Sequence, residues 1–314
     1  MNKWNFIKYF FILIGCLINI YMSAQTNRAL IVAIANYPLN SGWESIHADN
    51  DKKYILEILS LKEFQPAHIA ILSDEQATKA NISNALIKLY NDTEPGDAIF
   101  LHFSCHGQQM MDDNGDEEDG LDESLVLYDA KYKYIPQQYE GENHLRDDEL
   151  GIWLDKLRRK AGEAGRVTVT LDACHSGTAN RDGKEYLGDY KEYIRGTTAI
   201  FAPEGYVPLP GKHQELSLRL KKQKGLATIA VFSACLPEFT NYEYYDKQRS
   251  MYVGKLTYVF CRQIKKMKFS CTIKAFFQKL LKEMLYLKYS NLRLQTPYME
   301  CSDETVPFYI GQRK

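Results

Sequence analysis

The segment 166–177 constrains the fold and the chemistry of this chain more than any other stretch. It reads Arg-Val-Thr-Val-Thr-Leu-Asp-Ala-Cys-His-Ser-Gly, an apolar and β-branched run that ends abruptly in polar residues. Such a run favours a strand that is buried on both faces, and the Ser-Gly after the thiol predicts a sharp exit from it. We therefore expect Cys174 at the carboxyl end of a sheet strand, where open α/β folds carry their functional sites.

Similar apolar runs alternate with segments of helical periodicity along the chain. Strands are expected at 28–34, 68–74, 98–104, 166–174 and 226–235, with a short strand-like run at 124–128 and an edge strand at 305–310. Helices are expected at 49–61, 78–89, 147–160, 255–266 and 272–289. This alternation implies right-handed crossovers and a mainly parallel sheet flanked by helices, which is an α/β fold.

Composition places the chain among ordinary globular proteins and excludes one class of partner. The chain has 314 residues, of which 45% are hydrophobic and 25% charged, and its net charge is −1. A balance so close to neutral gives no global attraction for nucleic acid. We expect one domain over 25–314, with a surface insertion at about 178–225 that is rich in glycine, proline and basic residues.

The first 24 residues resemble a secretory signal peptide. Two lysines and no acid precede an apolar run from Tyr9 to Met22, and Ser23-Ala24 follows. Cleavage would make the protein exported, either periplasmic or secreted. Two alternatives stay open: a lipoprotein signal that leaves a lipid-anchored Cys16, and an uncleaved segment that anchors the chain. A membrane is a partner only in those two cases.

A second polar strand end offers a base for the thiol. The predicted strand 98–104 runs into Cys105, His106 and Gly107. The ends of neighbouring parallel strands lie about 5 Å apart, so His106 and Cys174 can converge. A nearby imidazole lowers the pKa of a cysteine or accepts its proton during nucleophilic attack. The N–H groups of Gly107 and Cys174 could then hold a developing oxyanion.

These motifs together resemble those of the caspase-like C14 peptidases, specifically the metacaspases. The resemblance is carried, in this order along the chain, by Phe-Ser-Cys-His-Gly at 103–107, Gly-Asp-Glu-Glu-Asp-Gly-Leu-Asp-Glu at 115–123, Asp-Asp-Glu-Leu at 147–150, Asp-Ala-Cys-His-Ser-Gly at 172–177 and Phe-Ser-Ala-Cys at 232–235. It implies the caspase-hemoglobinase fold with a mainly parallel six-stranded sheet. It also implies a cysteine endopeptidase in which His106 and Cys174 are the catalytic pair.

The resemblance also implies a preference for basic substrates. By similarity, Asp51, Ser104 and Asp172 line a pocket for Arg or Lys at the residue before the scissile bond. Asp172 lies two residues before Cys174 and so points to the same side of the strand. A buried carboxylate without a cationic partner is costly, which favours a basic ligand. The partners expected are therefore proteins or peptides with basic residues.

Calcium is the cofactor that the resemblance implies. The matching positions are Asp147 and Asp148, with Asp122 and Asp182 as further candidates. Carboxylate-rich loops bind hard cations through oxygen ligands. The loop at 112–123 resembles an EF-hand in part, but Glu117 stands where the sixth-position glycine is required.

Other interpretations of the same residues stay open. Asp172 could cap the following turn, Asp147 could cap its helix, and the 112–123 loop could be only a solvated acidic loop. Cys105 stands where the family usually has glycine, and Leu236-Pro237 precede the acid expected after Cys235. The insertion holds candidate sites for self-cleavage at Arg181, Lys184, Lys191 and Arg195.

Two rival functions remain beside the peptidase of metacaspase type. One is a catalytically silent caspase-fold protein that acts as a calcium-responsive interaction module. The other is an exported Arg/Lys peptidase of the clostripain or gingipain type, which shares the His-Gly and Cys strand ends. The segments at 119–123 and 172–177 favour the metacaspase interpretation.

Overall fold

The computed structural model describes residues 25–115, 117–174, 186–187, 190–191, 193–209, 220, 222–236, 239–287 and 295–311. The predicted signal peptide and Asp182 lie outside the described residues, as do Arg181 and Lys184. Among the helices in the described ranges, none combines the length and the apolar character needed to cross a membrane.

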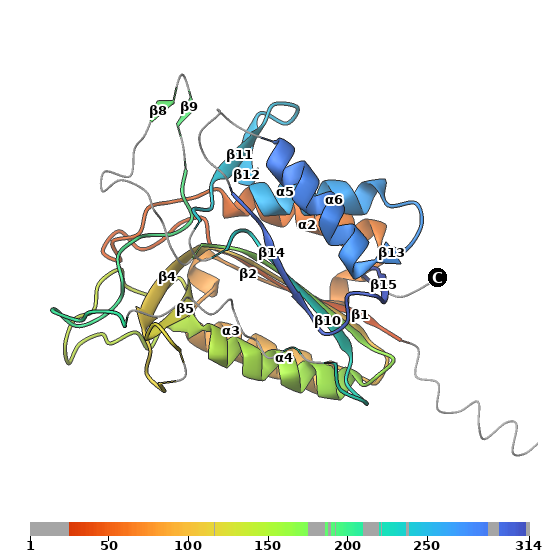
Figure 1. Ribbon diagram of the computed structural model, residues 1–314, viewed down its shortest axis with the longest axis horizontal. Helices are drawn as coiled ribbons and strands as arrows, with labels where there is room; N and C mark the ends of the chain where they lie inside the picture. Colours follow the sequence, from red (N-terminus) through yellow and green to blue (C-terminus); the bar gives the residue numbers. More distant parts are fainter. Residues whose placement is uncertain are drawn as a thin grey trace, which may run out of the picture.

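A six-stranded sheet forms the centre of the molecule, in the order β14-β10-β7-β3-β1-β2 (Figure 1). The strands are β1 (Asn27–Ala33), β2 (Ile69–Ser73), β3 (Ala98–Ser104), β7 (Arg166–Asp172), β10 (Thr228–Ser233) and β14 (Tyr298–Cys301). Five of these strands are mutually parallel, and β14 pairs antiparallel with β10. The predicted α/β class with a mainly parallel sheet is confirmed.

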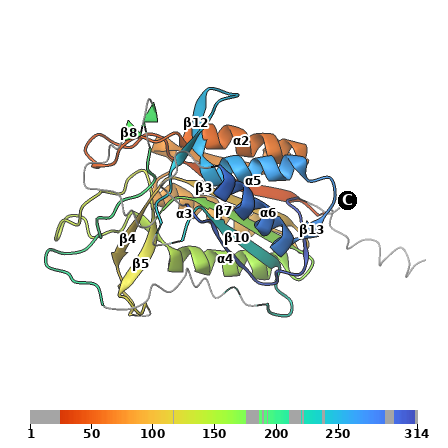
Figure 2. The ribbon, with the colours of Figure 1, turned by 45° about the horizontal axis from the view of Figure 1, so that its top comes forward.

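Helices cover both faces of this sheet. One face carries α2 (Ala48–Leu61), α5 (Lys255–Lys266) and α6 (Ile273–Tyr286), and the other carries α3 (Lys79–Asp92) and α4 (Asp147–Ala161) (Figure 2). The alternation along β1 explains the two layers. Leu30 and Val32 join the core beneath α3 and α4, whereas Ala29 and Ile31 join the core beneath α2, α5 and α6.

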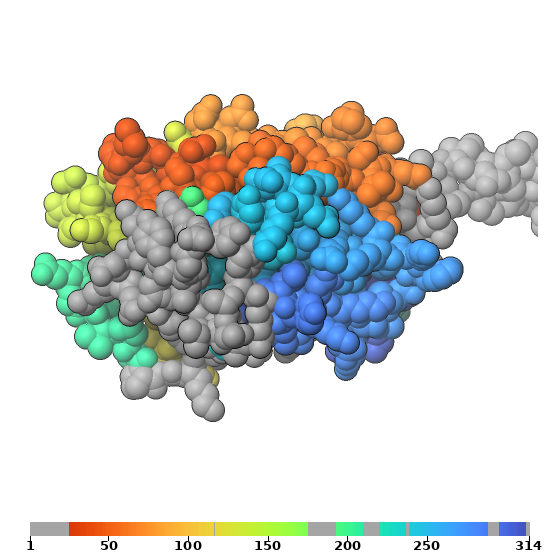
Figure 3. All heavy atoms as spheres, turned by 90° about the horizontal axis from the view of Figure 1, so that it is seen from above, coloured from red at the N-terminus to blue at the C-terminus, as the bar shows by residue number. Residues whose placement is uncertain are grey.

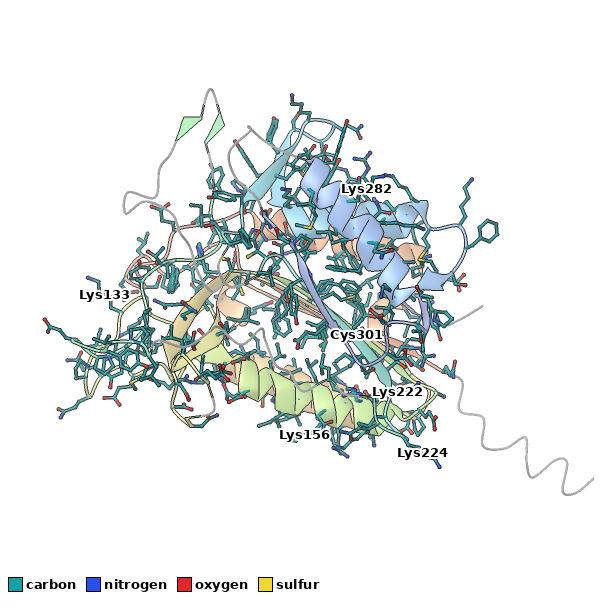
Figure 4. All side chains as sticks on the ribbon, in the orientation of Figure 1. Lys133, Lys156, Lys222, Lys224, Lys282 and Cys301 are labelled. Atoms are coloured by element: carbon teal, nitrogen blue, oxygen red, sulfur yellow. The ribbon has the colours of Figure 1, made fainter. Side chains whose placement is uncertain are left out.

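The outer faces of these helices are polar, as the helical periodicity predicts. Lys156 on α4 and Lys282 on α6 point away from the sheet (Figure 4). Inside the sheet, His102 on β3 is fully buried, and its Nδ1 lies 2.7 Å from the hydroxyl oxygen of Thr170 on the neighbouring strand. Burial lowers the pKa of His102 to about 3, so this imidazole is neutral in the folded protein.

Smaller sheets lie at both ends of the main sheet (Figure 1). They comprise β4 (His106–Met111), β5 (Leu121–Val126) and β6 (His144–Arg146); the hairpin β11 (Glu243–Asp246) and β12 (Met251–Gly254); the pair β13 (Cys271–Thr272) and β15 (Pro307–Phe308); and the pair β8 (Tyr186–Leu187) and β9 (Tyr190–Lys191). Short 3-10 helices follow Gln65 and Ser73, at η2 (Pro66–His68) and η3 (Asp74–Gln76). Seen from above, the cyan β11–β12 hairpin lies beside the orange residues of the α2 layer (Figure 3).

Two local predictions are wrong. The edge strand of the main sheet is Tyr298–Cys301 rather than 305–310, and Pro307–Phe308 instead pairs with β13. Pro307 lacks an N–H, so this run could not supply a full ladder of hydrogen bonds. The segment 193–201 of the predicted surface insertion is also not simply exposed, because Arg195 and Phe201 in it are buried.

Candidate active site

The adjacent strands β3 and β7 bring the predicted motifs to one edge of the sheet. Ser104 and Asp172 are register partners at the ends of these strands. His106 begins β4 directly after β3, and Cys174 follows β7 by two residues. The backbone N–H groups of Gly107 and Cys174 donate to one shared oxygen, the carbonyl of Arg195, at 3.3 and 2.9 Å. The sheet register therefore brings the His-Gly and Cys motifs together.

The imidazole of His106 is held in one orientation and one tautomer. Its Nε2 lies 2.9 Å from the carbonyl oxygen of Glu44, which can only accept, so Nε2 carries the proton. The ring of Trp43 stacks on His106 with the centroids 4.9 Å apart. Nδ1 is buried and has no hydrogen-bond partner among the described residues, which leaves its lone pair available.

Burial also sets the charge of this imidazole. Desolvation lowers the pKa of His106 to about 4, with a further lowering contribution from the positive charge of Arg195. The Glu44 carbonyl and the charge of Glu243 oppose this shift without cancelling it. The ring is therefore neutral near pH 7, which is the form that can accept a proton.

The thiol of Cys174 is fully buried beside a second thiol. Its Sγ donates to the carbonyl oxygen of Phe239 at 2.9 Å, and the Sγ of Cys235 lies 3.3 Å away. Neither cysteine forms a disulfide in this structure. Cys105, next to His106, is likewise a free and fully buried thiol, and burial raises its pKa to about 12. Cys105 is consequently a protonated core residue.

An acidic pocket lies next to the thiol and contains all three predicted pocket residues. Asp51 comes from the first turn of α2, Ser104 from the end of β3 and Asp172 from the end of β7, and each is fully buried. The hydroxyl of Ser104 donates to Asp51 at 2.8 Å, and the backbone N–H of Gly254 donates to the same carboxylate at 2.8 Å. A Cβ at Gly254 would lie 2.1 Å from an Asp172 oxygen, so only glycine fits there.

Among the described residues, the hydrogen bonds of the Asp172 carboxylate go to distant parts of the chain. Its carboxylate accepts from the backbone N–H and the hydroxyl of Thr257 on α5, at 2.8 and 2.6 Å, and from the side-chain amide of Asn241 at 2.9 Å. These bonds tie the end of β7 to distant parts of the chain and fix the carboxylate at the pocket wall.

The side chain of Arg195 fills this pocket. Its guanidinium makes a two-pronged contact with Asp51 at 2.5 and 3.1 Å, donates to Ser104 at 2.8 Å and lies 3.5 Å from an oxygen of Asp172. A third carboxylate, that of Glu243 on β11, accepts from Nε at 3.2 Å and from Nη2 at 2.9 Å. Arg195 is 0% exposed, so the expectation that it lies in an exposed insertion is wrong.

The backbone around Arg195 pairs in antiparallel fashion with residues 241–243, which lead into β11. Its N–H donates to the carbonyl of Asn241 at 3.0 Å, and the N–H of Glu243 donates to the carbonyl of Tyr193 at 3.0 Å. Ile194 forms an antiparallel bridge with Tyr242. An extended segment that pairs with a sheet edge and places alternate side chains in pockets is a recurring mode of peptide binding.

Three of the predicted calcium residues, Asp122, Asp147 and Asp148, fall into one acidic region at the start of α4, and Asp182 lies outside the described residues. Asp122 forms an ion pair with Arg146, and Asp148 accepts from the side-chain amide of Asn114 at 2.5 Å. Asp147 is the first residue of α4, but Arg146 takes the N-cap position, so capping is not its role. A group of carboxylates close enough to share one cation is formed by Asp112, Asp113 and Asp122.

Two carboxyl groups of this region have raised pKa values. Burial, followed by the charges of Asp148 and Glu117, raises the pKa of Asp147 to about 7. Burial and the charge of Asp147 likewise raise the pKa of Glu123 well above its ordinary value. A bound dication would relieve both effects, and oxygen ligands of this kind suit calcium. The oxygen ligands of this region suit a hard cation, but among the described residues the carboxylates close enough to share one do not include Asp147 and Asp148.

Comparison with known proteins decides the family. Residues 27–181, which include His106 and Cys174, match the profile described as metacaspase, peptidase C14 domain. Metacaspase-1 of Eremothecium gossypii is 34% identical over 166 residues, covering 51% of this chain and 34% of the relative. Metacaspase-1B of Aspergillus fumigatus is 42% identical over 118 residues, covering 35% of this chain and 26% of the relative.

The chain belongs to the metacaspase family of C14 peptidases. The family is one of cysteine-type endopeptidases. The matched part spans about a third of the length of the Eremothecium relative and about a quarter of the Aspergillus one.

Solved structures show the same fold. A protein of Geobacter sulfurreducens aligns with a TM-score of 0.58 at 22% identity, covering 92% of this chain and 97% of that chain. Caspase-1 of Spodoptera frugiperda aligns with a TM-score of 0.51 at 11% identity, covering 88% and 86%. This metacaspase therefore has the caspase-hemoglobinase fold that its motifs imply.

Sequence reasoning missed three contributors to the site, namely Glu243, Trp43 and the carbonyl of Glu44. Glu243 lies in a short tyrosine-rich segment that carries no signal, and Arg195 was named only as one of four self-cleavage candidates, because its stretch has no periodicity. Trp43 and the Glu44 carbonyl orient the imidazole of His106. The role of a backbone carbonyl does not depend on residue type, so it cannot be predicted from the sequence. An acid was expected directly after Cys235, but Leu236 and Pro237 stand there instead.

The low pKa of His106 can be measured by NMR titration of its imidazole, assigned with His106→Gln. We expect Trp43→Ala to admit water and raise the pKa of His106 from about 4 toward its ordinary value of 6.5, because desolvation is the largest cause of the shift. Trp43→Phe keeps a flat ring against the imidazole and should keep the low value. A wild-type His106 that titrates near 6.5 would contradict this description of the site.

Proposed function

We propose that this metacaspase is a cysteine endopeptidase that cleaves peptide bonds after arginine or lysine, with Cys174 as nucleophile and His106 as general base and acid. One observation carries the proposal. The carbonyl oxygen of Arg195 accepts two hydrogen bonds, from the N–H groups of Gly107 and Cys174, while its guanidinium fills the acidic pocket. A segment of the chain thus occupies the site as a substrate would.

The proposed reaction begins at the thiol of Cys174. The thiol exchanges its hydrogen bond to Phe239 for one to Nδ1 of His106, which accepts the proton as the sulfur attacks the scissile carbonyl carbon. The N–H groups of Gly107 and Cys174 stabilise the oxyanion that forms. His106 then gives its proton to the leaving amine, which leaves a thioester, and water hydrolyses this thioester with His106 again as base.

The pocket supports the preference for a basic residue before the scissile bond. The planar guanidinium matches the two oxygens of Asp51 and reaches Glu243 through Nε. An acidic residue in the same position would bring a fourth carboxylate next to Asp51, Asp172 and Glu243. Juxtaposed like charges of this kind cost several kcal/mol, so acidic substrates should be rejected.

We further propose that the enzyme processes itself at the bond between Arg195 and Gly196. The Arg195 carbonyl already lies between the two N–H donors, and Gly196 forms a bridge with Gly107. A Cβ at position 196 would lie 2.3 Å from the carbonyl oxygen of Cys174, so glycine allows the close approach. Of the self-cleavage candidates in the insertion, Arg195 is the one that these contacts favour.

Calcium as an activator is a separate proposal. Asp147, Asp148 and Asp122 would hold the ion, together with Asp182 beyond the described part of the chain, and the ion would neutralise their mutual repulsion. The predicted signal peptide supports export, and exported proteins can use calcium sites with dissociation constants of about 0.1 to 1 mM. The ion would act by ordering the acidic region and would take no part in the proton transfers at Cys174 and His106.

The activity is tested with fluorogenic peptides that end in Arg, Lys or Asp. We expect cleavage after Arg and Lys to exceed cleavage after Asp by more than about a thousand-fold, the equivalent of several kcal/mol. Cys174→Ala should lower the rate by about a million-fold, as loss of the nucleophile does in other proteases. Cys271→Ala, which changes a thiol outside the site, is the matched control and should keep full activity. Efficient cleavage after Asp, or activity that survives in Cys174→Ala, would refute the proposal.

The calcium proposal is tested by thermal and chemical unfolding as well as by activity. At a hundred-fold excess over its dissociation constant, a bound ion should raise the free energy of unfolding by about 2.7 kcal/mol. Asp147→Asn should lose most of this gain, whereas Asp155→Asn, on the exposed side of the same helix, should keep it. If calcium changes neither the unfolding nor the peptidase rate of the wild type, the proposal is wrong.

A further inference from the structure

An aromatic cluster lies next to the acidic pocket and includes a residue of the bound segment. The ring of Tyr193 packs edge-on against His47 with the centroids 4.5 Å apart, and edge-on against Tyr252 at 4.8 Å. His47 and Tyr252 stack on each other at 5.1 Å and 26°. Edge-to-face and stacked pairs at these separations are the favourable arrangements for aromatic rings.

His47 and Tyr252, the two residues that contact Tyr193, are held in place by other parts of the chain. The N–H and Nδ1 of His47 are held by Glu243, at 2.8 and 2.6 Å. The carbonyl of Tyr252 accepts from the side-chain amide of Asn50 on α2 at 2.8 Å, and its ring also packs against Tyr245 across the hairpin at 5.0 Å. His47 and Tyr252 therefore stay in place if the segment around Tyr193 leaves.

The position of Tyr193 along the bound strand follows from the backbone pairing. Tyr193 lies two residues before Arg195, and alternate residues of a strand point to the same face. With Arg195 as the residue before the scissile bond, called P1, Tyr193 stands at P3 and Ile194 at P2. The backbone bonds from Arg195 to Asn241 and from Glu243 to Tyr193 hold this register.

We propose that His47 and Tyr252 form a binding subsite for an aromatic side chain at P3. The inference rests on the proposed function and narrows its substrates to peptides with an aromatic residue two positions before a P1 arginine. The side chain of His47 is 31% exposed, so the subsite is open to a substrate once the segment at 193–195 is displaced. Tyr193 is then the occupant that a substrate replaces.

Glu243 links this subsite to the arginine pocket. One carboxylate oxygen accepts from the guanidinium of Arg195 and from the backbone of His47, and the other accepts from the ring of His47. Glu243 thus orients His47 in the P3 subsite and also binds the P1 side chain. Binding of arginine at P1 and of an aromatic ring at P3 should therefore favour each other.

The test compares peptides that differ only at P3. Tyr-Ile-Arg, Phe-Ile-Arg, Leu-Ile-Arg and Ala-Ile-Arg fluorogenic peptides are assayed with calcium on the full chain, both as the wild type and as Arg195→Gln, which removes the guanidinium from the pocket. We expect kcat/KM for Tyr and Phe peptides to exceed that for the Ala peptide by about ten-fold and that for the Leu peptide by a smaller factor, because stacking adds to apolar burial.

Variants show which residues cause the P3 preference. For each variant, the ratio of kcat/KM for the Tyr peptide to kcat/KM for the Ala peptide is measured. Tyr252→Ala should bring this ratio close to one, Tyr252→Phe should keep it, and Tyr286→Ala on the exposed side of α6 is the unrelated tyrosine control. His47→Ala provides a second route to the same loss if Tyr252→Ala does not fold.

The outcomes separate the two proposals. Cleavage of all Arg peptides with equal kcat/KM would overturn the P3 subsite and leave the Arg/Lys endopeptidase intact. An unchanged ratio in folded Tyr252→Ala and His47→Ala would also overturn it. If neither the wild type nor Arg195→Gln cleaves any Arg peptide, the proposed function fails and the subsite falls with it.

Discussion

The contact between the buried guanidinium of Arg195 and three carboxylates organises the structure around the site. Two charged groups removed from water lose several kcal/mol of solvation each, and only close geometry with further hydrogen bonds offsets that loss. Here Asp51, Asp172 and Glu243 come from α2, β7 and β11, and each carboxylate also accepts bonds from uncharged groups. The cation therefore holds together elements that are far apart in the sequence.

The same contact explains why the carboxylates are there. Burial, together with the charge of Asp172, raises the pKa of Asp51 to about 6 even though Arg195 lowers it, so an empty pocket would be unfavourable. Any ligand with a guanidinium in the same place would satisfy these acids equally well. Because Arg195 is part of the chain, it competes with external substrates at a high effective concentration, and its removal should control access to the pocket.

The fold and the central residues of the site follow from the sequence because they depend on strongly patterned strands. The apolar runs ending at Ser104 and Asp172 predict adjacent parallel strands, and their ends carry His106 and Cys174 on short connections. Glu243 and Arg195 depend instead on long connections. The partners Arg195 and Asp51 are 144 residues apart, and no periodicity in the insertion indicates which of its basic residues turns inward.

The misplaced edge strand has a similar cause. Thr305 to Ile310 is β-branched and aromatic enough to predict a strand, but Tyr298–Cys301 has the backbone donors that pairing with β10 needs. Local propensity therefore predicted that the C-terminal segment supplies the edge strand, but it did not identify which residues of that segment form it. In the acidic region, the composition predicts a cation site. The ion pair of Asp122 with Arg146 could not be predicted from the sequence, because it depends on the three-dimensional arrangement.

The occupation of the active site by Arg195, in the manner of a substrate, can be tested directly. The direct measurement is to incubate the purified full chain with calcium and to determine the new amino termini of any fragments by mass spectrometry. We predict a fragment that begins at Gly196, absent from Cys174→Ala and from Arg195→Gln. Cleavage at other basic residues with the 195–196 bond left intact, or the same fragment from Cys174→Ala, would contradict the account.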